Sequence, residues 1–112
     1  MTLNPFTLER KLALITGGGT GIGFGIASSF IQSGARVVIT GRREDVLKEA
    51  TGWLGENCHY VVNDITDFSS LPSLVDQIES KHGQIDILVN NAGTHLKKHA
   101  QHTSDAEFFG VI

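Results

Sequence analysis

The sequence Thr16-Gly17-Gly18-Gly19-Thr20-Gly21-Ile22-Gly23 decides how this chain folds. It follows the apolar run 12–15 and opens a helical pattern that extends over residues 22–31. A buried strand, a glycine-rich turn and a helix in this order are typical of a βαβ unit. The start of such a helix offers unpaired N–H groups and a partial positive charge, and glycines let an anion approach the backbone. The stretch therefore predicts a binding site for the pyrophosphate of a dinucleotide.

The remainder of the chain alternates between predicted strands and predicted helices. Strands are expected at 11–16, 36–40, 59–62 and 85–90, and helices at about 21–32, 44–54, 67–81 and from about 105 onward. Asp67 is the expected N-cap of the third helix, and Ser104 with Glu107 forms a capping box before the fourth. Almost entirely apolar strands separated by helices are typical of a parallel sheet that is covered on both faces. We therefore predict an α/β fold, a partial Rossmann-like doubly wound parallel sheet of about four strands in the order 3-2-1-4 with flanking helices.

Length and composition indicate a single domain over residues 1–112, cut off within the fourth predicted helix. The formal net charge of −3 is spread along the chain, so no basic stripe indicates nucleic acid. No apolar run approaches the roughly 20 residues of a membrane span. Cys58 is the only cysteine, which excludes an internal disulfide and favours a cytoplasmic location.

A second motif follows the strand predicted at 85–90. It reads Asn90-Asn91-Ala92-Gly93, and taken alone it is a polar turn. Together with the pattern T-G-x-x-x-G-x-G at residues 16–23 and with Asp64 after the third strand, it resembles the ordered motifs of the short-chain dehydrogenase/reductase family, classical type. The resemblance extends from Phe6 to Ile112, and it implies the N-terminal, cofactor-binding half of such a protein.

The resemblance also implies roles for individual residues around a nicotinamide dinucleotide. Asp64 would accept a hydrogen bond from the adenine amino group, and Ile65 would flank the ring. For Asp64, a solvated turn acid or a helix cap is the alternative. The expected contacts of the pyrophosphate and its ribose are Gly17, Thr20, Gly21, Ile22 and Gly23. Those of the adenosine ribose and the central strands are Asn90, Asn91, Ala92 and Gly93.

The residues after the second strand, Gly41-Arg42-Arg43, bear on the choice between two cofactors. NAD-dependent proteins usually place an acid there, which binds both ribose hydroxyls. A guanidinium instead binds a 2′-phosphate through paired, charged hydrogen bonds. Glycine followed by two arginines therefore favours NADP(H) over NAD(H). The alternative is that Arg42 and Arg43 are solvated and pair with Glu44 or Asp45.

The catalytic residues that the resemblance calls for are absent from the 112 residues. The family uses a serine and a Tyr-x-x-x-Lys pair, but the only tyrosine is Tyr60 and residue 64 is an aspartate. We therefore expect the NADP(H)-binding portion of an oxidoreductase that moves a hydride between nicotinamide and a carbonyl or alcohol, inactive by itself. One alternative is a non-catalytic nucleotide-binding or self-associating module derived from such a protein. A methyltransferase-like domain is disfavoured, because it needs an acid where Gly41 stands.

Two further expectations concern the last third of the chain. If no further strand follows, the strand at 85–90 is an open apolar edge, which favours self-association through that edge. His95, His99 and His102 are spaced as on one helix face, but the surrounding residues predict a loop, so no metal site is expected.

Overall fold

The computed structural model describes residues 7–64, 70–91 and 109–111 of the chain. Its elements are β1 (Leu12–Thr16), α1 (Gly21–Gln32), β2 (Arg36–Gly41), α2 (Glu44–Leu54), β3 (Cys58–Val62), α3 (Leu71–His82), β4 (Ile87–Asn90) and β5 (Phe109–Val111). They form one sheet with the strand order β3-β2-β1-β4-β5. The pairs β1–β2, β1–β4 and β2–β3 are parallel. The predicted order 3-2-1-4 and the Rossmann-like architecture are therefore confirmed.

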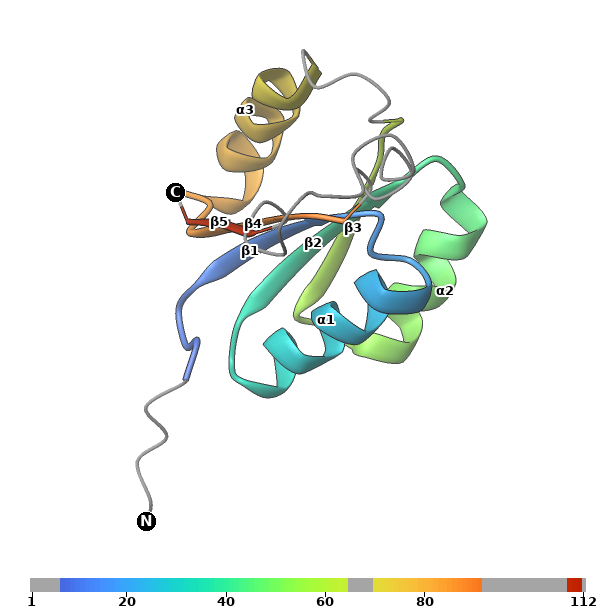
Figure 1. Ribbon diagram of the computed structural model, residues 1–112, viewed down its shortest axis with the longest axis horizontal. Helices are drawn as coiled ribbons and strands as arrows, with labels where there is room; N and C mark the ends of the chain where they lie inside the picture. The colour runs from blue at the N-terminus through green and yellow to red at the C-terminus, as the bar shows by residue number, and fades with distance from the viewer. Residues whose placement is uncertain (1–6, 65–69, 92–108, 112) are drawn as a thin grey trace, which may run out of the picture.

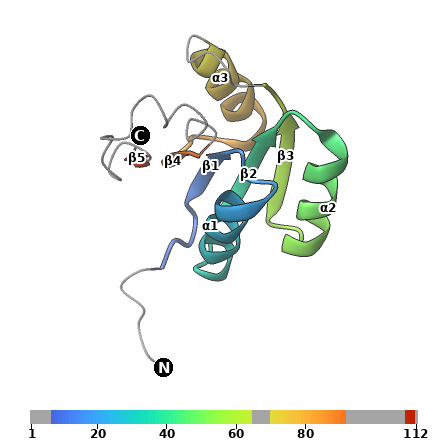
Figure 2. The same cartoon turned by 45° about the vertical axis from the view of Figure 1, so that its right-hand side comes forward.

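The helices cover both faces of this sheet. Figures 1 and 2 show that, of the described helices, α1 and α2 lie together on one face and α3 lies on the other. Successive residues of a strand point to opposite faces, so β1 contributes Ala13 and Ile15 to the core beneath α1 and α2, and Leu12 and Leu14 to the core beneath α3. All five residues of β1 are buried. Burial on both faces explains why the central strands read as continuous apolar runs.

The helix ends follow from local sequence, with one difference from expectation. Gly34 and Gly83 have φ values of 99° and 103°, and they end α1 and α3 in a conformation that suits glycine. The N-cap of α3 is Ser70 and not Asp67, which lies outside the described residues. Pro72 lies in the first turn of this helix, where its missing N–H costs nothing, and it favours a start just before that residue.

The prediction of a fourth helix from about residue 105 is wrong for the residues that the structure describes, 109–111. Phe109–Val111 form β5, which pairs antiparallel with β4 through Ile87↔Val111 and Val89↔Phe109. The other residues of that prediction, 105–108 and 112, lie outside the described part. A capping box is a weak local signal, and the unpaired backbone of β4 outweighs it here by accepting a strand. The predicted open edge at β4 is therefore wrong as well, and self-association through that edge loses its basis.

One finding concerns the lengths of the helices. The longest helices described, α1 and α3, have 12 residues each, and none of the described helices is long and apolar enough to cross a bilayer.

The centre of the sheet yields a first prediction. Leu14 has no exposed surface, and it lies between Val38 of β2 and Leu88 of β4. Replacing Leu14 by alanine leaves a cavity and should lower the free energy of unfolding by about 2–5 kcal/mol, measured by urea denaturation. The matched control is Val62→Ala on the edge strand β3, where 46% of the side chain is exposed and a loss below about 1 kcal/mol is expected. Equal losses in the two variants would contradict the assignment of the core.

Candidate functional site

The glycine-rich turn leaves the end of β1 and is fastened to the end of β2. The N–H groups of Gly17 and Gly18 both donate to the carbonyl oxygen of Thr40, over 2.8 Å and 3.3 Å. Gly17 has a φ of 68°, a conformation that few residues other than glycine adopt. A Cβ on Gly18 would lie 2.5 Å from Cγ2 of Ile39, so the turn passes directly over β2. Its backbone is therefore held in place by two hydrogen bonds and by close packing.

The N-terminus of α1 begins at this turn and is open to an anion. Its N-cap residue Thr20 has extended backbone angles, and its side chain makes no capping hydrogen bond. The first turn of α1 contains no acidic side chain. A Cβ on Gly21 would meet nothing within 4 Å, and 75% of Ile22 is exposed. The first N–H groups of α1 and its positive dipole end are thus accessible to a negatively charged group.

The closest approach in the site joins α1, the glycine turn and the end of β4. A Cβ on Gly23 would overlap the carbonyl oxygen of Gly17 and would lie 2.7 Å from Nδ2 of Asn91. Nδ2 of Asn91 donates to that same oxygen over 3.0 Å. Oγ1 of Thr16 donates to Oδ1 of Asn90 over 2.9 Å. Residues 74 positions apart in the sequence therefore meet at the carboxyl ends of β1 and β4.

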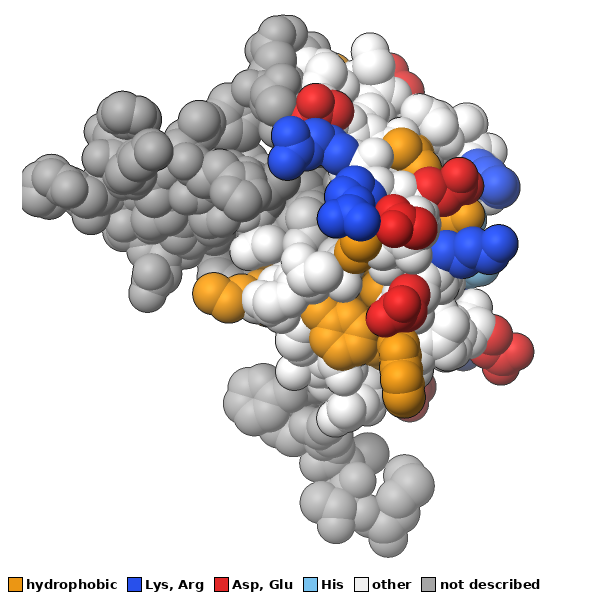
Figure 3. Space-filling view, turned by 90° about the vertical axis from the view of Figure 1, so that its right-hand side faces the viewer, with side chains coloured by type: hydrophobic (Ala, Val, Ile, Leu, Met, Phe, Trp, Pro, Cys, Tyr) orange, Lys and Arg blue, Asp and Glu red, His pale blue; other side chains and the backbone are white. Residues whose placement is uncertain are grey.

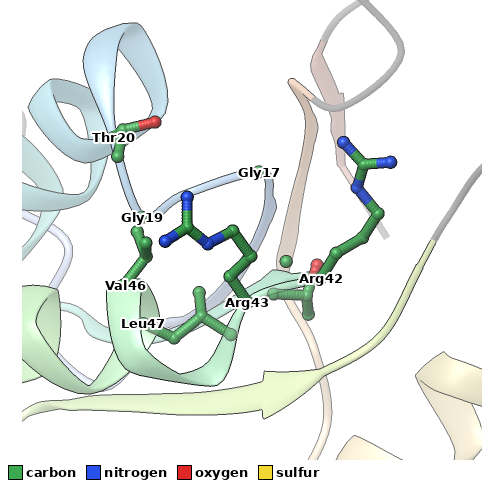
Figure 4. Close-up of a pocket in the computed structure, with 9 residues that line it drawn as sticks. Gly17, Gly19, Thr20, Arg42, Arg43, Val46 and Leu47 are labelled. Carbon is green, nitrogen blue, oxygen red and sulfur yellow. The ribbon is translucent and has the colours of Figure 1, made fainter.

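A pocket of about 200 Å³ lies between the glycine turn, the end of β2 and the start of α2 (Figure 4). Four of its lining residues were predicted from the sequence as site residues. Gly19, Thr40, Val46 and Leu47 were not predicted. Gly41 was considered only as the residue that stands in place of an acid after the second strand. A Cβ on Gly19 would lie 3.0 Å from Cγ1 of Val46, so the turn also packs against α2. The spacing of apolar residues along α2 is the one sequence pattern that could have indicated that Val46 and Leu47 face the rest of the protein. The complete lining is Gly17, Gly19, Thr20, Thr40, Gly41, Arg42, Arg43, Val46 and Leu47.

The two arginines at this pocket differ in their surroundings. In Figure 4 the guanidinium of Arg43 lies beside Gly19, whereas Arg42 extends to the other side of the pocket. Nη2 of Arg43 is 3.1 Å from Oδ2 of Asp45, and this contact holds the pKa of Asp45 below its usual value. Arg42 forms no ion pair with any residue that the structure describes. The expected alternative, pairing with a neighbouring acid, is therefore observed for Arg43 and not for Arg42.

The surface around α2 has no uniform charge. Figure 3 shows Lys and Arg side chains there interspersed with Asp and Glu, and hydrophobic side chains also reach this face. One of the exposed hydrophobic residues of the described chain is Trp53 at the end of α2, with 78% of its surface exposed. The positive charge at the pocket therefore comes from Arg42 and Arg43 and not from a larger basic surface.

The end of β3 lies beside the pocket without lining it. The N–H of Asn63 donates to the carbonyl oxygen of Gly41 over 2.8 Å, and Asp64 follows as an exposed residue. Asp64 is therefore at the same edge of the sheet as the glycine turn. Three other predicted site residues, Ile65, Ala92 and Gly93, lie outside the described residues, as do His95, His99 and His102. Within the described part, no three potential metal ligands form a group.

Tyr60, the only tyrosine, has a structural partner in α2. Its hydroxyl donates to Oε2 of Glu44 over 2.9 Å and thereby links β3 to the first turn of α2. The carboxylate of Glu44 raises the pKa of Tyr60 above its ordinary value, since it accepts the phenolic proton and repels a phenolate. Tyr60 is therefore held in its neutral form, the opposite of an activated acid–base group.

Comparison with known proteins gives consistent matches. A family model described as short chain dehydrogenase matches residues 11–112. Oxidoreductase asL5 of Sarocladium schorii is 44% identical over 86 residues, which are 77% of this chain and 34% of that protein. The NADP-dependent (R)-specific alcohol dehydrogenase of Lentilactobacillus kefiri is 38% identical over 103 residues, which are 90% of this chain and 41% of that protein. The crystal structure of 2-keto-3-deoxy-D-gluconate dehydrogenase from Streptococcus agalactiae has a TM-score of 0.72 at 40% sequence identity, over 92% of this chain and 40% of that one. The chain thus spans about a third to two fifths of the length of these relatives.

The close approach at Gly23 yields a second prediction, with a control in the same helix. Gly23→Ala should destabilise the protein by about 1–3 kcal/mol, because its methyl group displaces the carbonyl of Gly17 or the side chain of Asn91. Gly25→Ala should stabilise it by about 0.5–1 kcal/mol, because a Cβ there meets nothing within 4 Å and alanine favours a helix. Thermal or urea unfolding measures both. Opposite signs are the expected result, and two similar changes would show that helix propensity alone decides them.

Proposed function

This chain belongs to the short chain dehydrogenase family, and from that membership we propose that it is the NADP(H)-binding portion of an oxidoreductase. When bound, the nicotinamide ring of the cofactor donates or accepts the hydride, and in the complete protein a carbonyl or alcohol is its partner. The observation that carries the proposal is that Arg42 and Arg43 line one pocket together with the glycine turn. The proposed phosphate-binding start of α1 and two arginines would thereby act on one ligand.

The residues at the start of α1 fit the pyrophosphate. The space where a Cβ of Gly21 would lie is open, so a phosphate oxygen can reach the backbone there. The N–H groups of Gly21, Ile22 and Gly23 belong to the first turn of α1 and have no acceptor earlier in that helix. These three residues would bind the pyrophosphate, and the dipole of α1 would stabilise its charge.

The end of β2 supports NADP(H) over NAD(H). Gly41 stands where a carboxylate would repel a 2′-phosphate and would bind the two ribose hydroxyls instead. Arg42 has no acidic partner among the described residues, so its guanidinium is available for a bidentate contact with a phosphate. A relative that is 38% identical is named as NADP-dependent, which is in keeping with this choice.

The chain by itself is proposed to bind the cofactor and not to turn over a substrate. Its 112 residues contain no Tyr-x-x-x-Lys, and Tyr60 is bound to Glu44 with a raised pKa. The alternative is a non-catalytic nucleotide-binding module, which shares the binding step and differs in never joining a catalytic half. We also propose a cytoplasmic location, since the single cysteine, Cys58, is free and buried.

The cofactor preference yields a third prediction. The protein should bind NADPH more tightly than NADH, measured by calorimetry or by the fluorescence of the reduced cofactor. Arg42→Gln should weaken NADPH binding about tenfold to a hundredfold, because it removes a charged hydrogen bond worth about 1.5–3 kcal/mol. The same variant should change NADH binding by less than about threefold, since NADH has no 2′-phosphate for Arg42 to bind.

Two further variants complete this experiment. Gly41→Asp should reverse the preference, and it is sterically acceptable because a Cβ there lies 3.3 Å from Cδ2 of the flexible Leu47 side chain. Lys48→Gln is the charge-matched control, since Lys48 is exposed on α2 and is not among the residues lining the pocket. Equal binding of NADPH and NADH by the unaltered protein would refute the NADP preference alone. Failure to bind either cofactor at millimolar concentration would refute the binding function.

The absence of a catalytic pair yields a fourth prediction. Purified protein with NADPH and a panel of aldehydes and ketones should show no oxidation of the cofactor above the rate without protein, followed by absorbance. The control is an intact member of the family in the same assay, which establishes that the panel is adequate. Turnover that remains after further purification, and that is lost in Gly23→Ala, would overturn the proposed inactivity.

A further inference from the structure

A cluster of basic groups lies where the end of α3 meets the starts of β2 and β3, at the opposite end of the sheet from the glycine turn. The rings of His59 in β3 and His82 in α3 have their centroids 4.8 Å apart and are tilted by 35°. Nη2 of Arg36, the first residue of β2, donates to the carbonyl oxygen of His82 over 3.0 Å. Lys81 precedes His82 in the last turn of α3. We call these four residues the basic cluster.

The basic cluster has no acidic counterpart in the described structure. The charged groups that act on His82 are His59 from β3, Lys81 from its own helix and Arg36 from β2, and all of them are cationic when charged. The two acids that flank this end of α3 are otherwise engaged. Oε2 of Glu79 accepts from the N–H of Ile85, and Oδ2 of Asp86 accepts from the N–H of Leu12. The charged neighbours that act on a proton added to His82 are therefore cationic.

The direction of the resulting pH dependence follows from His82. Burial, followed by the charges of His59, Lys81 and Arg36, lowers the pKa of His82 below its ordinary value of 6.5. The unfolded chain, or a state with α3 detached, therefore takes up the proton at a higher pH than the folded chain does. The contribution of His82 to stability is complete above about pH 6.5 and is lost as the pH falls through the lowered pKa.

The position of α3 makes it the element that would respond to protonation of His82. Among the described helices, α3 is the one on its face of the sheet (Figure 1), and its buried residues are Leu74 and Ile78. The contact of His82 with His59 joins the last turn of α3 directly to β3. Repulsion at that contact therefore acts on the attachment of α3 and leaves α1 and α2, on the other face, untouched.

We propose that α3 is a proton-sensitive latch, in which protonation of His82, in contact with His59, loosens the helix from the sheet at mildly acidic pH. The chain before α3 comes from Asp64, and the chain after it leads through Asp86 into β4 and Asn91. Loosening α3 thus reaches both segments that border the candidate nucleotide site.

Hydrogen exchange of the whole chain between about pH 7.5 and about pH 5.5 tests this, with rates corrected for the intrinsic pH dependence. Exchange of the amides of α3 should accelerate several-fold relative to those of α1 and α2 as the pH falls. In His59→Gln the acid-induced acceleration should shrink, and the NMR titration of His82 should move to higher pH, because one positive neighbour is gone. Lys81→Gln is the control, since it removes a charge but keeps the contact between the two imidazoles, and it should retain the acceleration.

Each outcome decides the proposal. The latch is supported if exchange accelerates preferentially in α3 and if this acceleration shrinks in His59→Gln but not in Lys81→Gln. Equal acceleration of all helices, or a titration of His82 that is unaffected by His59→Gln, overturns it. Because these readouts use the protein without cofactor, the latch and the proposed function fail separately. If the proposed function also holds, NADPH affinity should fall at pH 5.5 more in the unaltered protein than in His59→Gln.

Discussion

The absence of a side chain at residue 23 is the constraint on which the site depends. Any Cβ there would overlap the carbonyl oxygen of Gly17, which also accepts a hydrogen bond from Asn91. This close approach brings the start of α1, the turn after β1 and the end of β4 into one packed unit. Because protein interiors are packed to near-crystalline density, one methyl group is enough to separate these three segments. The same packing fixes the position of the start of α1 relative to the glycine turn.

The two ends of the sheet carry different kinds of side chains. The carboxyl ends of the strands carry the pocket, the start of α1 and the guanidinium of Arg42, which has no acidic partner among the described residues. The opposite end carries the basic cluster, where His59 and His82 are in contact and Arg36 binds the last carbonyl of α3. The proposed cofactor binding at one end and the proposed proton response at the other are joined by α3 and β4. The chain on either side of α3 leads to Asp64 and to Asn91, which border the candidate site.

The family motifs were readable because they depend on local backbone chemistry. Gly17 needs a positive φ and Gly23 needs room, and both requirements leave a trace in the sequence. Val46 and Leu47 were not recognised as pocket residues, because an apolar pair on a helix reads as ordinary core. The expected N-cap of α3, Asp67, lies outside the described residues, and the structure gives Ser70 as the N-cap of this helix. The helix predicted over residues 109–111 was wrong, because pairing of β5 with β4 depends on a neighbour that no local pattern reveals.

By itself the sequence determined the alternation of strands and helices, the parallel order of β1 to β4 and the family, since apolar runs, glycines and helix caps act over short distances. Only the tertiary structure decided which distant segments share a site. It brought Arg42 and Arg43 to the pocket of the glycine turn, because the ends of β1 and β2 are neighbours in the sheet. It also decided that His59 and His82, from different elements, share a contact. Such contacts depend on distances in space, and those distances exist only once the chain has packed.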